Sequence, residues 1–173
     1  MIQLSFQPAF DPFHALYRIL RLFTIMQQHG PLHRDQVRIL DYYMLFPYRA
    51  GAIRMLQKHR RFKGLLARFE TRKPYGEQPD DRTLFERMEP MQIAAFQTLA
   101  KRGLIDSGEL AVGSVRVTDA PIPAELEERI AAANEQDAEL IEFLSALVTD
   151  LPLAGSQGLK DRTGLLEYRY DAV

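Results

Sequence analysis

Hydrophobic positions recur with a helical period along much of the chain. A first stripe follows Asp11 and Pro12 and consists of Phe13, Leu16, Tyr17, Leu20, Phe23 and Met26. Asp11 can cap the first turn, and the pattern stops at Gly30 and Pro31, so it predicts one helix between these limits. A second stripe predicts another helix that ends before Pro47, and its members are Val37, Leu40, Tyr43 and Met44.

A third helix is predicted over residues 50–69, but it contains two glycines. Gly51 and Gly64 each cost about 1 kcal/mol relative to alanine in a helix interior, so the helix can break at either position. Prolines, a glycine and charges mark residues 71–82 as a loop, and Asp80 or Asp81 is expected to cap the next helix. That helix is short, and a turn at Glu89–Pro90 leads from it into a longer helix that ends at Gly103.

Residues 104–118 predict a strand, a turn and a second strand. A two-residue turn at Gly113–Ser114 places two apolar pairs on one face, Val112 opposite Val115 and Leu110 opposite Val117. Short helix, turn, longer helix and hairpin is the order of a winged helix-turn-helix. The predicted fold class is mainly α with a small β-hairpin, that is, a winged helix-turn-helix-like core with extra N-terminal helices and a long C-terminal helix.

The two ends complete the predicted organisation. Ile2, Leu4 and Phe6 alternate with polar residues as in a short strand, and residues 123–148 predict the C-terminal helix. In the tail, residues 155–164 read as loop, and an edge strand is expected from Leu166, Tyr168 and Tyr170. We expect a single domain, 1–173, with a core over 7–118, an acidic C-terminal helix over 119–150 and a tail over 151–173.

Composition narrows the class of protein. With 173 residues, of which 46% are hydrophobic, the chain can bury one core. The formal net charge is −1, so any electrostatic recognition must be local. Absence of cysteine excludes disulfides, thiolate-bound zinc and a thiol nucleophile. No secretion signal or apolar run of about 20 residues is present, so we expect a cytoplasmic protein without a membrane partner.

The sequence has no recognisable catalytic or metal-binding pattern. No pair of the four histidines has the helical spacing and intervening glutamate of a zinc hydrolase, so no metal is predicted. The Gly155–Thr163 stretch lacks the spacing of a phosphate-binding loop, and no cofactor is predicted. Asp80 and Asp81 are explained by helix capping rather than by a catalytic pair. The sequence therefore predicts no catalytic residue and no enzyme.

Charge is unevenly distributed. Residues 49–73 hold nine lysines or arginines and one acid, whereas residues 119–150 hold nine acids and one base, Arg129. If residues 54–69 are one helix, four cations fall within about 80° of one another; they are Arg54, Lys58, Arg61 and Arg68. This strip is interpreted as a solvated face, a phosphate contact or a site for an acidic protein. The basic and acidic segments either pair with each other or orient the molecule between two partners.

The longer helix of the winged unit has few polar side chains. They are Gln92, Gln97, Thr98, Lys101 and Arg102. Winged domains that read a major groove place basic or amide side chains near the start of this helix, where Glu89, Pro90 and Met91 stand. We interpret the unit as protein-binding, with Lys101 and Arg102 added to the four cations as candidates for contact with DNA or an acidic partner.

Three stretches resemble the middle component of bacterial ABC-three-component systems. They are Phe-Asp-Pro-Phe-His-Ala-Leu-Tyr-Arg at 10–18, Leu-Asp-Tyr-Tyr-Met-Leu-Phe-Pro at 40–47 and Leu-Phe-Glu-Arg-Met-Glu-Pro-Met-Gln-Ile at 84–93. The resemblance covers roughly residues 6–118 and leaves the acidic segment outside. It implies an accessory subunit encoded between an SMC-like or Rad50-like ATPase and an effector, in a system that acts against phage or plasmids.

The sequence supports three hypotheses about function. The first is a non-catalytic adaptor that binds the SMC-like or Rad50-like ATPase and the effector subunit, which can be a nuclease, with non-specific DNA contact as an added property. The second is a winged-helix transcription regulator that acts as a homodimer. The third is a small enzyme that uses His14, Asp41 or Asp81. We favour the first because the sequence lacks catalytic motifs and resembles a middle component. The third is disfavoured because each candidate residue has a structural explanation.

Overall fold

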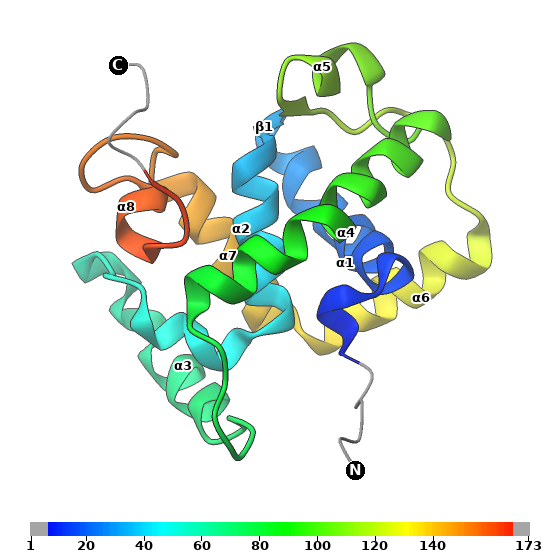
Figure 1. The fold of residues 1–173 in the computed structure, drawn as a ribbon. Coiled ribbons are helices and arrows are strands. Elements are labelled where there is room, and N and C mark those ends of the chain that lie inside the picture. The colour runs from blue at the N-terminus through cyan, green and yellow to red at the C-terminus, as the bar shows by residue number, and fades with distance from the viewer. Residues whose placement is uncertain (1–6, 168–173) are drawn as a thin grey trace.

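The computed structural model describes residues 7–167, which are mainly helical with a small two-stranded antiparallel sheet (Figure 1). The elements are the 3-10 helix η1 (Pro8–Phe10), α1 (Pro12–His29), β1 (Leu32–His33), α2 (Arg34–Leu45), η2 (Pro47–Ala52), η3 (Gln57–Phe62), α3 (Lys63–Glu70), α4 (Asp81–Lys101), α5 (Ser107–Ala111), β2 (Ser114–Val115), α6 (Ala124–Gln136), α7 (Ala138–Asp150) and α8 (Leu159–Thr163). The strand expected at residues 2–6 lies outside the described residues.

Helix α1 is the centre of the molecule. Its first turn is capped as predicted, because the carboxylate of Asp11 accepts a hydrogen bond from the backbone N–H of His14 at 2.9 Å. It ends at Gly30, whose φ of 78° suits glycine. The helix packs against α2, α4, α6 and α7, and Figure 1 shows α4 crossing in front of it. Leu20, Phe23 and Met26 of its apolar stripe are buried in the middle of the hydrophobic core, whereas Phe13, the first member of the stripe, is exposed.

Helix α2 also agrees with its prediction. His33 opens it, because its Nδ1 accepts from the N–H of Asp35 while Gln36 Oε1 accepts from the N–H of His33. The helix ends at Leu45, before Pro47. Tyr42 and Tyr43, on adjacent positions, are both buried, so this helix faces the core over much of its circumference.

The turn expected at Glu89–Pro90 is wrong, because α4 runs without interruption from Asp81 to Lys101. Asp80 caps it by accepting from the N–H of Thr83. A proline inside a helix costs about 3 kcal/mol. Burial on both sides of Pro90 offsets this cost, since one continuous helix buries six apolar side chains, namely Leu84, Phe85, Met88, Ala95, Phe96 and Leu99.

The expected hairpin is also wrong. Leu110 belongs to the short helix α5, which Asp106 caps by accepting from the N–H of Glu109 at 2.8 Å. Val112 is exposed rather than opposite Val115, because β2 pairs with the distant β1 in the antiparallel register Leu32 with Val115 and His33 with Ser114. Ile105 forms a single antiparallel bridge with Val117. A strand partner about 80 positions away leaves no local signal.

The C-terminal helix is divided at Asp137 into α6 and α7. Arg21 of α1 holds this break, because its guanidinium donates to the carbonyl of Ala133, to Asn134 Oδ1 at 2.9 Å and to Asp137 Oδ2 at 2.7 Å. The break lets both helices pack on α1. No described helix is both long and apolar enough to cross a bilayer.

The tail contains a helix where a loop was expected, since residues 159–163 form α8. The turn before it requires Gly158, where a Cβ atom would lie 2.3 Å from the carbonyl oxygen of Ala154. Lys160 is buried beside Asp35 at 3.5 Å, which ties α8 to α2. Leu166 lies in a bend rather than a strand, and the other two residues of the expected edge strand lie outside the described residues.

Candidate functional site

The four cations of the predicted strip lie on three different local structures. Residues 53–56 separate η2 from η3, so the expected single helix over 54–69 is wrong. Packing explains the interruption, because Ile53 is buried and the backbone N–H of Arg54 donates to the carbonyl of Arg162 at 3.2 Å. Arg54 lies in this segment, Lys58 and Arg61 in η3, and Arg68 in α3.

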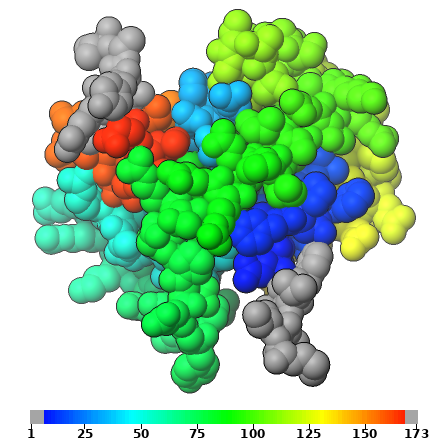
Figure 2. Space-filling model, in the orientation of Figure 1, coloured from blue at the N-terminus to red at the C-terminus, as the bar shows by residue number. Residues whose placement is uncertain are grey.

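Each of these cations contacts an acid from the C-terminal part of the chain. The pairs are Arg54 Nη2 with Asp161 Oδ1 (2.7 Å), Lys58 Nζ with Asp150 Oδ1 (2.5 Å), Arg61 Nη1 with Glu142 Oε1 (3.2 Å), and Arg68 with Glu139. We call these four ion pairs the seam. Three of its acids belong to α7 and the fourth to α8. Figure 2 shows the cyan surface around residue 55 meeting the orange and red surface of the C-terminal part.

His59 makes a second contact with Asp150, the acid of the seam that pairs with Lys58. Its side chain is buried, and its Nδ1 accepts from the N–H of Leu56, so Nδ1 carries no proton. Nε2 therefore donates to Asp150 Oδ2 at 2.8 Å. The hydrogen bond from Lys58 and the one from His59 hold the pKa of the Asp150 carboxyl below its ordinary value. The neighbouring Phe62 packs edge-on against Phe143 of α7, which adds an apolar contact under the charges.

The cations of the seam remain accessible, with side chains that are 56–60% exposed. Exposed ion pairs contribute about 0–1 kcal/mol each and are screened by salt. The basic and acidic segments thus pair within the chain. The pairing is weak enough that another charged molecule can compete for either side.

Lys101 and Arg102 do not join this group. They are exposed at the end of α4, whose 21 residues extend about 30 Å. The start of α4 lies beside η2, and its end lies near α5 (Figure 1). The six residues predicted to contact DNA or an acidic partner therefore form two separate surfaces.

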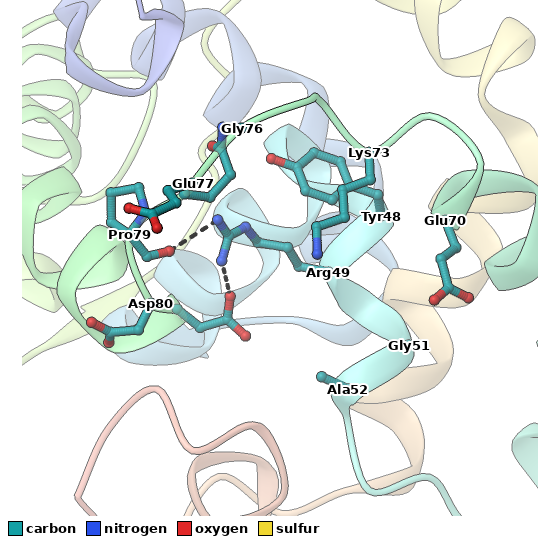
Figure 3. A pocket seen from close by; sticks show the side chains of 12 residues that line it. Tyr48, Arg49, Gly51, Ala52, Glu70, Lys73, Gly76, Glu77, Pro79 and Asp80 are labelled. Atoms are coloured by element: carbon teal, nitrogen blue, oxygen red, sulfur yellow. Dashed lines mark hydrogen bonds and ion pairs between the residues drawn. The ribbon is translucent and has the colours of Figure 1, made fainter.

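A pocket of about 630 Å³ lies beside the basic segment, between η2, the end of α3 and the start of α4. Figure 3 shows Arg49 at its centre, with Glu77 and Pro79 on one side and Tyr48 and Lys73 on the other. Arg49 donates to the carbonyl of Pro79 at 3.0 Å and pairs with Asp81. Tyr75, in the loop over this region, is fully exposed.

The electrostatics of this pocket depend on Asp81. Burial works against the charge of Arg49, but its hydrogen bonds to Asp81 and Tyr48 raise its pKa above the ordinary value. Tyr42 donates to Asp81 at 2.9 Å, and burial together with that carboxylate raises the pKa of the Tyr42 hydroxyl. The Asp81 carboxylate thus contacts both the guanidinium of Arg49 and the hydroxyl of Tyr42. These contacts hold the 71–80 loop against η2.

The polar side chains of the second half of α4 are largely engaged. Gln92 is completely buried and bonds to Arg38 and Asp41. The hydroxyl of Thr98 donates to the carbonyl of Ala94 at 2.8 Å. Gln97 faces a pocket of about 350 Å³ that α5 partly covers. Three of the five side chains considered for base reading form no hydrogen bond or ion pair within the described part of the chain, namely Gln97, Lys101 and Arg102.

A family model described as "ABC-three component (ABC-3C) system Middle Component 5" matches residues 4–171. The chain belongs to this family. The match extends over the acidic helices α6 and α7 as well, which the resemblance in the sequence left outside. The comparison with curated proteins finds no match, and neither does the comparison with solved structures.

Three histidines of this middle component make structural contacts. His29 Nε2 lies 2.9 Å from the hydroxyl of Ser145, His33 caps α2, and His59 bonds to Asp150. Among residues 7–167, no three histidine, aspartate or glutamate side chains converge as metal ligands. Of the three positions considered for catalysis, Asp41 pairs with Arg18 and Asp81 with Arg49, while His14 is exposed on the first turn of α1.

Sequence reasoning missed the pocket at Arg49. The available signals were a base at the start of the basic segment and two aspartates at the start of α4, but the aspartates were explained as caps. Asp80 does cap α4, whereas Asp81 turns toward Arg49. Two adjacent residues of one motif therefore have different roles, and only the path of the 71–80 loop decides which is which.

Proposed function

We propose that this middle component is a non-catalytic accessory subunit that binds an SMC-like or Rad50-like ATPase and an effector in a bacterial anti-phage or anti-plasmid defence complex. The observation that carries this proposal is the match to the middle-component family along residues 4–171. A middle component works with the other components of its system. The hydrogen bonds and ion pairs of His29, His33, His59, Asp41 and Asp81 support a role in binding rather than in bond-making.

Co-purification tests the proposal. The full chain, co-expressed with the ATPase encoded beside it, is expected to elute with that ATPase at low and at moderate salt. The purified chain alone is expected neither to hydrolyse ATP nor to cut DNA. Separate elution at low salt would contradict the proposal, as would nucleotide turnover by the isolated chain.

Non-specific contact with DNA along Arg54, Lys58, Arg61 and Arg68 is a further part of the proposal. Phosphates have to displace the acids of the seam, so the contact should be weak and fall steeply with salt. Replacing two acids, Glu139→Gln with Glu142→Gln, should strengthen binding to a random DNA duplex several-fold at low salt. The same change at two other exposed acids, Glu77→Gln with Glu135→Gln, serves as control. Equal binding by all three proteins would remove DNA from the proposal.

We also propose that α4 and the strands after it form a winged-helix arrangement. The β1–β2 ladder and the Ile105–Val117 bridge lie beside the end of α4, as strands lie beside the second helix of such a unit. Burial of Gln92 favours a protein-binding unit over a transcription regulator. If the protein is a transcription regulator, it should bind DNA sequence-specifically, and Lys101→Ala with Arg102→Ala should abolish that binding. If it is an adaptor, the same variant should still co-elute with the ATPase.

A further inference from the structure

A groove of about 340 Å³ lies between the first turns of α1 and helix α6. It is lined by Phe13, His14, Tyr17, Leu126 and Arg129. Figure 2 shows the dark blue start of α1 at the surface, with yellow α6 next to it. The hydroxyl of Tyr17 donates to the carbonyl of Arg129 at 3.4 Å and closes the inner end. The groove thus has a rigid floor made by two packed helices.

Phe13 is the unusual member of this lining. Its side chain is 78% exposed, although it stands on the central helix of the core. Pro12 and the Asp11 cap fix the backbone of this turn, which keeps the attachment point of the Phe13 ring at the surface. Leaving an aromatic ring in water forgoes the free energy of burying it. An exposed aromatic side chain at the rim of a groove is typical of an anchor for a protein partner.

The charge beside the groove identifies the kind of partner. Glu125, Glu127 and Glu128 of α6 are exposed, and none forms an ion pair with another described residue. The acids of α7 are different, because they are neutralised by the seam. Arg129 is the one base on α6, and Glu125 stands one turn before it on the same side of the helix. Glu125 therefore borders the apolar mouth of the groove, whereas Glu127 and Glu128 lie about 100° and 160° from Leu126 around the helix, and residues 125–129 together carry a net charge of −2.

We infer that the α1–α6 groove binds a large apolar side chain of a positively charged amphipathic helix from a partner protein. The groove and Phe13 receive the apolar side chain, and Glu125, within the net negative charge of residues 125–129, attracts lysines or arginines beside it. The inference rests on the proposed function only in that an accessory subunit has protein partners. It adds the surface and the chemistry of the segment that is bound.

The test uses two fluorescein-labelled synthetic helical peptides and the full chain. Both peptides carry the same leucine face, and their polar positions are lysine in one and glutamate in the other. Fluorescence anisotropy should show binding of the lysine peptide and not of the glutamate peptide. Phe13→Ser should weaken the binding at least about tenfold, as for an aromatic anchor. Glu125→Gln with Glu127→Gln should weaken it several-fold at low salt and little at high salt.

Two matched controls distinguish binding in the groove from non-specific binding to exposed apolar or acidic side chains. Val112→Ser removes an apolar side chain with the same 78% exposure, at the end of α5. Glu77→Gln with Glu135→Gln removes two exposed acids, one on the 71–80 loop and one on α6 at about 180° from Leu126. Neither control should change the dissociation constant. Equal binding of the lysine peptide to wild type and Phe13→Ser, or equal binding of both peptides, would overturn the inference.

Other occupants of the groove give different results. If a second copy of the chain fills it, sedimentation shows a wild-type dimer that Phe13→Ser abolishes. If another part of the same chain fills it, Phe13→Ser lowers the melting temperature, whereas a free ring predicts no decrease. Either result overturns the inference. Loss of ATPase co-elution by the wild type concerns only the proposed function, because the peptide titration does not involve the ATPase.

Discussion

The molecule contains two sets of ion pairs in opposite surroundings. In the core, Arg18 of α1 donates to both carboxylate oxygens of Asp41 at 2.6 and 3.1 Å, and Gln92 of α4 donates to the same carboxylate at 2.8 Å. Arg38 extends this buried network to Gln92 and to Glu89. At the surface, the seam joins exposed bases to α7 and α8. Asp41 has no exposed surface, whereas the cations of the seam are more than half exposed.

The difference lies in what happens when one partner is removed. A charge left alone in the core loses its counter-ion and has no water to replace it, so removal costs several kcal/mol. A charge left alone at the seam is solvated at once, so removal costs little. The buried network therefore holds α1, α2 and α4 in one arrangement. The seam leaves its charges open to competition by a partner or by salt.

The largest expected effect comes from breaking the buried pair. Asp41→Asn leaves Arg18 without its counter-charge, and the free energy of unfolding should fall by about 3–5 kcal/mol in urea titrations. Replacing both partners, Arg18→Met with Asp41→Leu, should restore most of this loss because neither member of the pair is left buried without its counter-charge. A single substitution that unfolds no earlier than wild type would contradict the contrast between core and seam.

Gln92→Leu should have the next largest effect. It removes one hydrogen-bond partner each from Arg38 and Asp41, and the cost of unsatisfied buried groups is about 1–3 kcal/mol. Gln97→Leu, five residues later on the same helix, is the matched control at an exposed glutamine. Its urea midpoint should stay close to that of wild type. Equal destabilisation by both variants would show that the network does not act through burial.

Breaking the seam should have a smaller effect. Arg61→Ala with Arg68→Ala should lower the free energy of unfolding by less than about 1 kcal/mol per pair, and added salt should reduce the difference. Arg60→Ala with Lys63→Ala removes two exposed bases that form no ion pair with a described residue. This control should match wild type at every salt concentration. A loss of unfolding free energy that persists in high salt would show that the seam contributes to stability in the same way as the buried network.

The smallest expected effect is a decrease in stability at acidic pH. The pKa of Asp150 is lowered, chiefly by the hydrogen bond from Lys58. A lowered folded-state pKa gives stability that is present above the unfolded value, near about 4, and is lost as the pH falls through the folded value. The melting temperature of wild type should therefore decline below about pH 4, with a shallower decline in Asp150→Asn. Parallel curves would show that this carboxylate does not contribute.

Local patterns predicted the elements whose signals lie within a few residues. The Asp11 cap, the Gly30 end of α1 and the end of α2 before Pro47 all depend on neighbouring atoms, and they are confirmed. Helix α4 through Pro90 and the strand pairing of Val115 with Leu32 were predicted wrongly. In both cases a contact with a distant segment outweighs the local preference.

The candidate sites show the same division. The basic strip and the acidic segment are visible as runs of charge, because charge can be counted along a chain. Whether they pair depends on where α7 lies relative to η3 and α3. The pocket at Arg49 left only an ambiguous signal, because capping explained both Asp80 and Asp81. The exposure of Phe13 left none, since Phe13 fits the apolar stripe of α1 as well as its buried members do.

By itself, the sequence determined the helical class, the caps, the uneven charge and the resemblance to a middle component. These properties depend on residue type and on spacing within a few turns. The tertiary structure decided that the basic strip meets the acids of α7 and α8, that Asp41 and Gln92 are buried, and that Phe13 is exposed. Such outcomes depend on contacts between segments far apart in the chain, where burial sets the free energy of each charge and each ring.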